Sequence, residues 1–468
     1  HSFPTRRSSD LMNNSGVTVG LDIGTTSIKV VIAQTTGNQF NVIGAGNAPS
    51  RGLHKGVIVD IDATAGAIRE AIDQAQEKAN FQINEVVAGV PANQIEMLHV
   101  DGLVSIANQN KRITYEDVQH VAQQALSNSL PSDRDVIDLI AEEFSVDGFD
   151  GIKDPHEMIG VRLEMHGTAY LGPTKILDNT RMAIQKAGLT LREFVLAPLA
   201  VGTSILNDGE QDFGTVLIDL GGGQTTTSII HDRKLKFNSV DLEGGDNVTK
   251  DISTVLSTSY ANAEKLKRDY GFADPTQTNV KNEFAVEVVG DATPRTANEH
   301  YLSEIIAARL EQIFTRAFEP LNTVNGLNMP GGFVLTGGNA ALPRMVDFAK
   351  TILGENVRLF VPDQIGLRHP SYTRAMAYAM FASRESMTQQ VIKQVIMARH
   401  DDTSYVQPTS QVTSQAPVTY IETSESNTQA QGFDEYHYNS NQGNQIEQPK
   451  KGFFGRWMQT IKNLFRED

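Results

Sequence analysis

Three short apolar runs rich in β-branched residues open the sequence: VTVGLDI from Val17, then IKVVIA, then FNVIGAG. Glycine-rich turns separate these runs, a pattern that predicts short strands joined by tight turns. From about residue 61 to residue 79 the spacing of apolar positions becomes helical. The first part of the chain is therefore predicted to form a three-stranded meander followed by a helix.

The same order of elements returns in the second half of the chain. From Thr215 the runs VLIDL, TTSII and LKFNSV precede a helical stretch at about residues 246–257. An internal duplication is the simplest explanation. Both copies are interrupted, the first by residues 94–171, which have strand and helix patterns of their own, and the second by residues 242–310, near a strongly helical run at 298–318.

The composition changes sharply after Ala398, where Gln, Ser, Thr and Asn dominate and aliphatic residues become rare. Such a segment cannot bury enough apolar surface to order itself, so residues 399–449 are predicted to be a disordered linker. A flexible coil of about 50 residues has an end-to-end distance of roughly 40 Å. The segment beyond it is therefore predicted to move independently of the folded part.

The last nineteen residues, KKGFFGRWMQTIKNLFRED at 450–468, have an amphipathic helical pattern. On a helical projection the large apolar side chains fall within an arc of about 140°, and basic residues lie on or beside the polar face. This pattern is typical of a helix that lies in a membrane interface, whereas a helix docked on the folded core is the alternative. The candidate membrane-binding residues are Phe453, Phe454, Trp457, Met458, Ile461, Lys462, Leu464, Phe465 and Arg466.

Length and composition exclude several classes of protein. A chain of 468 residues with 40% apolar residues suggests two or more domains. With 56 acidic and 40 basic residues the net charge is −16, which argues against a general nucleic-acid binder. Cysteine is absent, so disulfides and thiolate metal sites are excluded. The polar residues 1–11, ahead of Met12, look like a non-native leader.

Two motifs combine glycine with hydroxyl side chains between strands: LDIGTTS at 21–27 and IDLGGGQTT at 218–226. Glycine lets backbone N–H groups approach a phosphate without a Cβ atom in the way. Asp22 and Asp219 each end the preceding strand, where a carboxylate can hold the water shell of Mg²⁺ or position water. A plain structural turn is the alternative for either motif alone. The candidate phosphate-binding residues are Gly24, Thr25, Thr26, Ser27, Gly221, Gly222, Gly223, Gln224 and Thr225.

A third element, FVLTGGNAALPRM at 333–345, is predicted to be a strand, a Gly337–Gly338 turn and a helix with Pro343 in its first turn. The three elements in this order resemble the superfamily of actin, Hsp70-type chaperones and sugar kinases. The resemblance implies that ATP is the ligand and that the third turn borders adenosine. The residues implied near the nucleoside are Gly245, Glu264, Lys267, Arg268, Gly337, Gly338 and Asn339. For Glu264, Lys267 and Arg268, the alternative is that they form a solvated face of a helix.

Three longer segments, at 140–164, 243–252 and 369–379, resemble the FtsA family of actin-like bacterial cell-division proteins. The resemblance implies a peripheral protein on the cytoplasmic face of the cell membrane at the division site. It further implies ATP-dependent self-polymerisation, tethering of the tubulin homologue FtsZ to the inner leaflet, and contacts with later division proteins. By the same likeness, Arg295 and Arg309 would bind the acidic C-terminal peptide of FtsZ; solvated arginines are the alternative.

Two departures from related ATPases bear on catalysis. Chaperone-like relatives carry a glutamate that orients the attacking water where this chain has Ala197, and many relatives carry an aspartate where it has Thr226. With fewer groups to position water, we expect nucleotide binding with slow hydrolysis. A sugar kinase or chaperone-type ATPase remains an alternative, as does an actin-like protein of pilus or secretion assembly.

The expected fold class is α/β, an actin/Hsp70-like duplicated ATPase fold with an inserted α+β subdomain in the first half. A disordered linker and a C-terminal amphipathic helix follow the folded part. The expected boundaries are the leader 1–11, subdomain 1A at 12–93, 172–206 and 373–398, the inserted subdomain 1C at 94–171, subdomain 2A at 207–241 and 311–372, subdomain 2B at 242–310, the linker at 399–449 and the terminal helix at 450–468.

Overall fold

The computed structural model describes residues 15–37, 39–107, 111–127, 131, 133–324 and 326–402. The predicted leader at 1–11 and the terminal helix at 450–468 lie outside the described residues. The predicted linker also lies outside them, except that residues 399–402 belong to a helix. In the described part of the chain, no helix is both long and apolar enough to cross a bilayer.

A five-stranded sheet forms the centre of the first half, with strand order β11-β6-β1-β2-β3. Strands β1, β2 and β3 are antiparallel neighbours, as the meander predicts. Strand β6 pairs with β1 in parallel, and β11 pairs with β6 in parallel. The strands are β1 (Ser15–Ile23), β2 (Ser27–Thr36), β3 (Gln39–Pro49), β6 (Glu85–Val90) and β11 (Thr190–Leu196). A small hairpin, β4 (Leu53–His54) and β5 (Val57–Ile58), follows β3.

Helices cover this sheet because each presents an apolar stripe to it. Helix α1 (Ile61–Ala79) has the predicted limits; the Asp60 side chain caps its N-terminus by accepting from the Ala63 N–H. Helix α3 (Thr174–Lys186) packs beside α1, and α10 (Thr373–Ser383) packs on β1 and on α4 (Ala197–Ile205). Their buried side chains form one hydrophobic core with the sheet.

The second half repeats this arrangement, with strand order β14-β13-β12-β17-β18. The antiparallel β12–β13–β14 unit corresponds to β1–β2–β3, and β17 joins β12 in parallel. The strands are β12 (Thr215–Leu220), β13 (Thr225–His231), β14 (Lys234–Asp241), β17 (Phe333–Thr336) and β18 (Val357–Leu359). Two sheets with the same order of elements agree with the predicted duplication.

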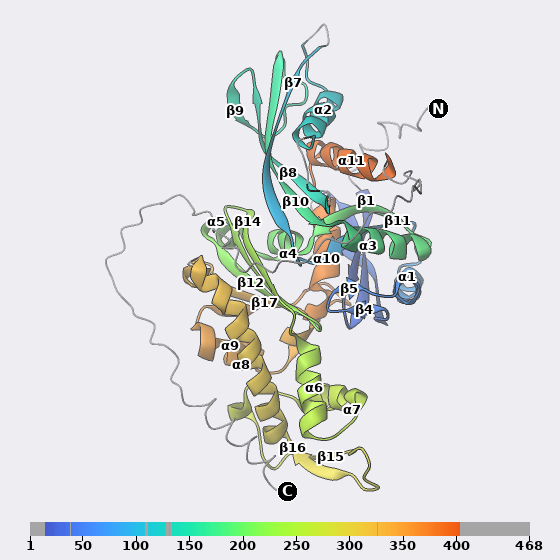
Figure 1. Ribbon diagram of the computed structural model, residues 1–468, viewed down its shortest axis with the longest axis vertical. Helices are drawn as coiled ribbons and strands as arrows, with labels where there is room; N and C mark the ends of the chain where they lie inside the picture. Colours follow the sequence, from blue (N-terminus) through green and yellow to red (C-terminus); the bar gives the residue numbers. More distant parts are fainter. Residues whose placement is uncertain are drawn as a thin grey trace, which may run out of the picture. The chain divides into compact units, whose positions relative to one another are not determined.

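Each half carries an additional group of elements (Figure 1). In the first half, the antiparallel sheet β7-β10-β8-β9 packs against α2 (Tyr115–Ala125). Its strands are β7 (Glu96–Ser105), β8 (Arg134–Val146), β9 (Phe149–Ile152) and β10 (Arg162–Pro173). The second half carries α6 (Gly245–Val255), α7 (Tyr260–Tyr270), the hairpin β15 (Glu283–Val286) and β16 (Arg295–Asn298), and the long helix α8 (Glu299–Thr323). The predicted α/β fold with an inserted α+β subdomain is confirmed.

The last helix, α11 (Met387–Asp402), packs on α2 and β8 of the inserted sheet. Its apolar residues Val391, Ile392, Val395 and Ile396 belong to the core of that subdomain. Figure 1 shows α11 beside α2, although residues 373–398 were expected to return to the first sheet. Helix α10 follows that expectation, whereas α11 does not.

A buried cluster of charges joins α11 to its surroundings. The Lys393 ammonium lies 2.6 Å from Glu193 Oε2 on β11 and 3.3 Å from Asp138 Oδ2 on β8, and also pairs with Glu385. All four side chains are at most 7% exposed. Because paired charges tolerate burial better than single ones, the lysine needs these neighbours. The cluster thus connects α11, the first sheet and the inserted sheet.

Candidate functional site

The two glycine hairpins form the turns between β1 and β2 and between β12 and β13. Each needs a glycine at the same place: a Cβ on Gly24 would lie 2.7 Å from the Ser27 carbonyl oxygen, and a Cβ on Gly221 would lie 2.7 Å from the Gln224 carbonyl oxygen. Such contacts are too short for any other residue without a backbone shift. The duplication therefore extends to the geometry of the turns.

The hairpins also lie against each other. A Cβ on Gly222 would meet the Thr26 side chain at 2.4 Å, and one on Gly223 would meet the Thr25 side chain at 2.7 Å. The Thr25 hydroxyl in turn accepts from the Gly56 N–H at 3.0 Å. Residues from both halves of the chain thus form one continuous lining.

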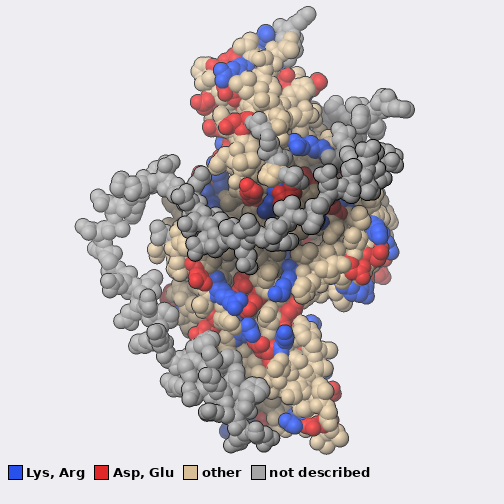
Figure 2. All heavy atoms as spheres, in the orientation of Figure 1, with Lys and Arg blue, Asp and Glu red and all other residues tan. Residues whose placement is uncertain are grey.

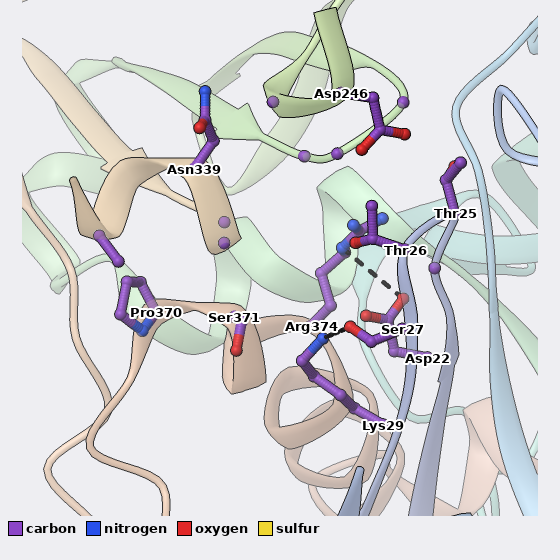
Figure 3. Close-up of a pocket in the computed structure, with 18 of the residues that line it drawn as sticks. Asp22, Thr25, Thr26, Ser27, Lys29, Asp246, Asn339, Pro370, Ser371 and Arg374 are labelled. Atoms are coloured by element: carbon purple, nitrogen blue, oxygen red, sulfur yellow. Dashed lines mark hydrogen bonds and ion pairs between the residues drawn. The ribbon is translucent and has the colours of Figure 1, made fainter. Parts of the chain in front are cut away.

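A cavity of about 640 Å³ opens beside the hairpins. This volume falls in the range of small-molecule and cofactor sites. The structure brings nearly all the predicted nucleotide-binding residues to its wall, namely Gly24, Thr25, Thr26, Ser27, Gly221, Gly222, Gly223, Gln224, Gly245, Glu264, Lys267, Arg268, Gly337, Gly338 and Asn339, together with Asp22. Figure 3 draws 18 of the lining residues, and the hydroxyl side chains of the first hairpin are among those labelled.

Two predicted residues do not line this cavity. Thr225 is buried, and its hydroxyl donates to the Glu243 carbonyl oxygen at 2.9 Å, so it supports the turn from behind. Asp219 lies deeper and lines a separate void of about 10 Å³ with Ala197 and Thr226. The two positions where related ATPases carry acids therefore adjoin Asp219 rather than the open cavity.

The third turn differs in detail from its prediction. Gly337 follows β17 with a φ of 93°, a conformation that favours glycine, and leads into a short 3₁₀ turn, η4 (Gly338–Ala341). Helix α9 (Met345–Leu353) begins only after Arg344, its N-cap. Pro343 therefore precedes the helix and is not in its first turn. The proline still lines the cavity.

The charged residues of α7 are only partly a solvated helix face. The Arg268 side chain is 71% exposed, but that of Lys267 is 9% exposed, and its ammonium lies 2.7 Å from Glu264 Oε2. It also donates to the Gly245 carbonyl oxygen at 3.1 Å. Burial raises the pKa of Glu264, but Lys267 and neighbouring donors outweigh burial, so this pKa lies below its usual value. Lys267 thus joins α7 to the start of α6.

Arg374 on α10 is the main site residue that the sequence did not reveal. Its Nε lies 3.2 Å from Asp219 Oδ2 and 3.6 Å from Asp22 Oδ1, between the ends of β12 and β1. Burial raises the pKa of Asp219 despite this pairing. A single arginine among the apolar residues of HPSYTRAMAYA was the only available signal, and its partners are distant in sequence.

Lys29 supplies a second positive charge. Its side chain is buried, lines the cavity and donates to the Ser27 hydroxyl (Figure 3). Burial lowers the pKa of its ammonium, and the nearby Arg374 guanidinium lowers it further, whereas Asp22 and Asp219 oppose the shift. A lysine on this strand could equally have been solvated, and the structure shows that Lys29 is buried.

The arrangement does not fit the Mg²⁺ site expected at Asp22 and Asp219. The expected role of the two carboxylates was to hold the water shell of Mg²⁺, whereas in this structure both pair with one guanidinium, that of Arg374. Within the described residues, no three His, Cys, Asp or Glu side chains are grouped to hold a metal ion. The site therefore carries its positive charge on side chains.

Several polar atoms at the site lack a partner. Gln224 Oε1 and Asn339 Nδ2 are buried, belong to residues lining the cavity and form no hydrogen bond with the described residues. Buried polar groups are nearly always hydrogen-bonded, so such atoms require an explanation. A polar ligand in the cavity can supply the missing bonds.

The two arginines expected to bind a peptide lie outside this cavity. Arg295, on β16, has a 68% exposed side chain and pairs with Asp291 at 2.8 Å. Arg309, on α8, has a 20% exposed side chain and pairs with Asp251 at 2.5 Å and with Glu243 at 3.1 Å. Arg309 is thus engaged within the fold, whereas Arg295 is open to solvent.

On the face shown in Figure 2, basic and acidic side chains of the described residues are mixed. A nucleic-acid site needs positive charge gathered on one face. This distribution agrees with the net charge of −16.

Comparisons with known proteins agree on one family. The model of "Cell division protein FtsA" matches residues 216–377, and that of "SHS2 domain inserted in FTSA" matches residues 92–170. Cell division protein FtsA of Enterococcus hirae is 50% identical over 394 residues, covering 83% of this chain and 89% of its own length. That of Bacillus subtilis is 40% identical over 378 residues, covering 81% and 86%.

A solved structure supports the fold independently. The structure titled "PilM-PilN type IV pilus biogenesis complex" superposes with a TM-score of 0.53 at 16% identity, covering 79% of this chain and 99% of that chain. At this identity the likeness concerns the fold alone, which is actin-like, as the resemblance implied. The relatives and the two family models lead to one conclusion. The chain belongs to the FtsA family of cell division proteins.

Proposed function

We propose that this cell division protein binds ATP in the cavity beside the two hairpins. The observation that carries the proposal is the convergence of both hairpins and the Gly337–Gly338 turn on one cavity of about 640 Å³. Backbone N–H groups at glycine turns are suited to phosphates, and a glycine turn can accept a flat base. The unpartnered Gln224 and Asn339 side chains are available to the same ligand.

The expected reaction is slow hydrolysis of the bound nucleotide. The void beside Asp219 is lined by Ala197 and Thr226, neither of which can act as a general base. Positioning of the attacking water is a large part of catalysis in this class of reaction. We therefore propose that the bound nucleotide controls the state of the protein and that slow hydrolysis ends that state.

The experiment is equilibrium ATP binding to the full chain and to two glycine variants. A Cβ on Gly338 would meet only the Ser371 Cβ atom, at 3.6 Å, so Gly338→Val narrows the cavity without disturbing the turn. We expect this variant to weaken ATP at least about tenfold, a loss of about 1.4 kcal/mol. Gly16→Val is the matched control, since a Cβ there meets nothing within 4 Å. ATP affinity equal to wild type in Gly338→Val contradicts the proposal.

We further propose that the chain tethers FtsZ filaments to the cytoplasmic face of the membrane through residues 450–468. The support is the amphipathic pattern of that segment beyond a long polar linker. Burying a large apolar side chain is worth about 1.5–3 kcal/mol at most, and a basic residue near anionic lipid adds about 1 kcal/mol. One tail should therefore bind reversibly.

Self-association would convert this weak anchor into a firm one. After the first tail of a polymer binds, the others re-engage at high effective concentration. ATP-dependent polymerisation would thus couple the nucleotide cavity to membrane attachment. Contacts with later division proteins belong to the same proposal.

For the FtsZ peptide, the proposed contact is the surface around Arg295 at the start of α8. A helix N-terminus and an exposed arginine both favour a carboxylate. Arg295 is accessible because its side chain is 68% exposed, although it pairs with the neighbouring Asp291. Arg309 contributes by holding α8 to α6 and to the segment ahead of it through Asp251 and Glu243.

A further inference from the structure

The charge balance around Arg374 sets this site apart from a metal-assisted phosphate site. Asp22 and Asp219 supply two negative charges, and Arg374 and Lys29 supply two positive charges that face them. A carboxylate that already has a guanidinium partner is a poor ligand for Mg²⁺, and the guanidinium itself repels the ion. The phosphates of a nucleotide nevertheless need positive charge nearby.

The guanidinium is placed to supply that charge. Arg374 lines the main cavity as well as the small void behind it. Both ion pairs run through Nε, whereas Nη2 faces the second hairpin, 3.6 Å from the ideal Cβ position on Gly221. In Figure 3 the side chain points from α10 toward the hairpins, and a dashed line joins it to Asp22. A guanidinium has five N–H donors in a planar fork, which suits phosphate oxygens.

The surrounding residues hold the guanidinium in this position. Asp22 ends β1 in the first half of the chain, Asp219 lies in β12 in the second, and Arg374 comes from a helix packed on β1. The side chain is only 20% exposed, so its orientation is set before any ligand arrives. A preorganised donor loses little entropy on binding, which favours a role in ligand recognition.

We propose that Arg374 takes the place of the divalent metal: its guanidinium, fixed by Asp22 and Asp219, contacts the phosphates of the bound nucleoside triphosphate, which therefore binds without Mg²⁺. This inference rests on the proposed ATP site. Lys29, beside the first hairpin, adds to the positive charge. The competing explanation is that Arg374 only clamps the two sheets together.

The test is equilibrium binding of ATP to the full chain in excess Mg²⁺ and in EDTA. For the wild-type protein we expect affinities within about threefold of each other, a difference of less than 1 kcal/mol. For Arg374→Gln we expect a loss of at least about tenfold in EDTA, since a charge-assisted hydrogen bond is lost. Mg²⁺ should restore part of that loss, because Asp22 and Asp219 are then free to hold the ion. Arg374→Lys should keep binding in EDTA.

Arg384→Gln is the matched control, since Arg384 is exposed and follows the same helix. Wild-type binding that requires Mg²⁺ overturns the inference and leaves the ATP site standing, whereas no ATP binding in either buffer overturns the ATP site itself. If Arg374→Gln binds ATP as tightly as wild type in both buffers, Arg374 only holds the two sheets together, and the inference is also overturned. If Arg374→Gln does not fold, the wild-type and Arg374→Lys measurements decide.

Discussion

Lys393 is surrounded by three buried carboxylates. Because one ammonium cannot neutralise three carboxylates, the stability of the folded state should depend on pH. With all four groups ionised, one positive charge would face Asp138, Glu193 and Glu385 in a region almost without water. Burial raises the pKa of Glu385 to about 8, even though the Lys393 ammonium opposes the shift and the other two acids reinforce it. Burial likewise raises the pKa of Asp138.

We predict that this cluster makes the folded state less stable as pH rises from about 4.5 toward 8. In that window Glu385 is ionised in the unfolded chain but stays protonated in the folded chain. The free energy of unfolding that this group contributes at low pH is therefore lost as the pH rises. Glu385→Gln removes the titration in both states. The unfolding temperature of the variant, measured by thermal denaturation, should therefore rise relative to that of wild type when the pH is changed from 5 to 8.

The control for this prediction is Glu355→Gln, whose side chain is 89% exposed. Its difference from wild type should be the same at both pH values. A Glu385→Gln difference that is equally independent of pH would show that Glu385 titrates normally in the folded protein.

Individual residues also show which parts of the site could be predicted from the sequence. Thr25, Thr26 and Ser27 could be predicted because glycine, hydroxyl and strand patterns are local. Arg374 and Lys393 could not, because their roles depend on acids more than 150 residues away in the chain or on another sheet. The sequence likewise did not reveal that Asp22 and Asp219, the expected Mg²⁺ residues, share a distant partner, Arg374.

At the scale of elements, the close approach of α10 to β1 positions Arg374. A Cβ on Gly20 would lie 2.0 Å from the Ala375 carbonyl oxygen and 2.9 Å from the Ala379 nitrogen. On this side the helix presents two small residues, Ala375 and Ala379, which are fully buried. Helix α10 also packs on α4, the helix that contains Ala200.

We predict that Gly20→Ala lowers the free energy of unfolding by about 1–3 kcal/mol or more, because the added methyl group forces α10 away from the sheet. Gly16→Ala, in the same strand, should stay within about 0.5 kcal/mol of wild type, since its Cβ meets nothing within 4 Å. Urea denaturation measures both. Equal stabilities of the two variants would mean that the sheet and helix separate at little cost.

Elements with strong periodicity were predictable, and their ends and packing partners were less so. The limits of α1 were predicted at both ends, and α8 begins one residue after its predicted start and continues to Thr323. The predicted linker began at residue 399, whereas α11 continues to Asp402, because its last residues resemble the polar segment that follows. Nothing local indicated that α11 packs on the inserted sheet.

At the scale of the whole molecule, the proposed tether joins a compact acidic body to a basic end segment. Co-sedimentation with anionic vesicles, with and without ATP and FtsZ, tests it. We predict that the full chain binds, that deletion of 450–468 abolishes binding, and that polymer-forming conditions strengthen it through multivalency. An equally long deletion of residues 410–428 is the matched control and should leave binding intact. Binding indifferent to both polymer state and tail deletion would refute the tether.

The position of α11 also decides where mechanical load enters the fold. Any pull on the C-terminal segment reaches the body first through Asp402, at the end of a helix that packs on the inserted subdomain. Tension would therefore be borne by the apolar contacts of α11 and by the Lys393 cluster, which ties this helix to β8 and β11. The hairpins lie in other strands, so tension on the proposed anchor would strain α11 while the proposed nucleotide pocket keeps its shape.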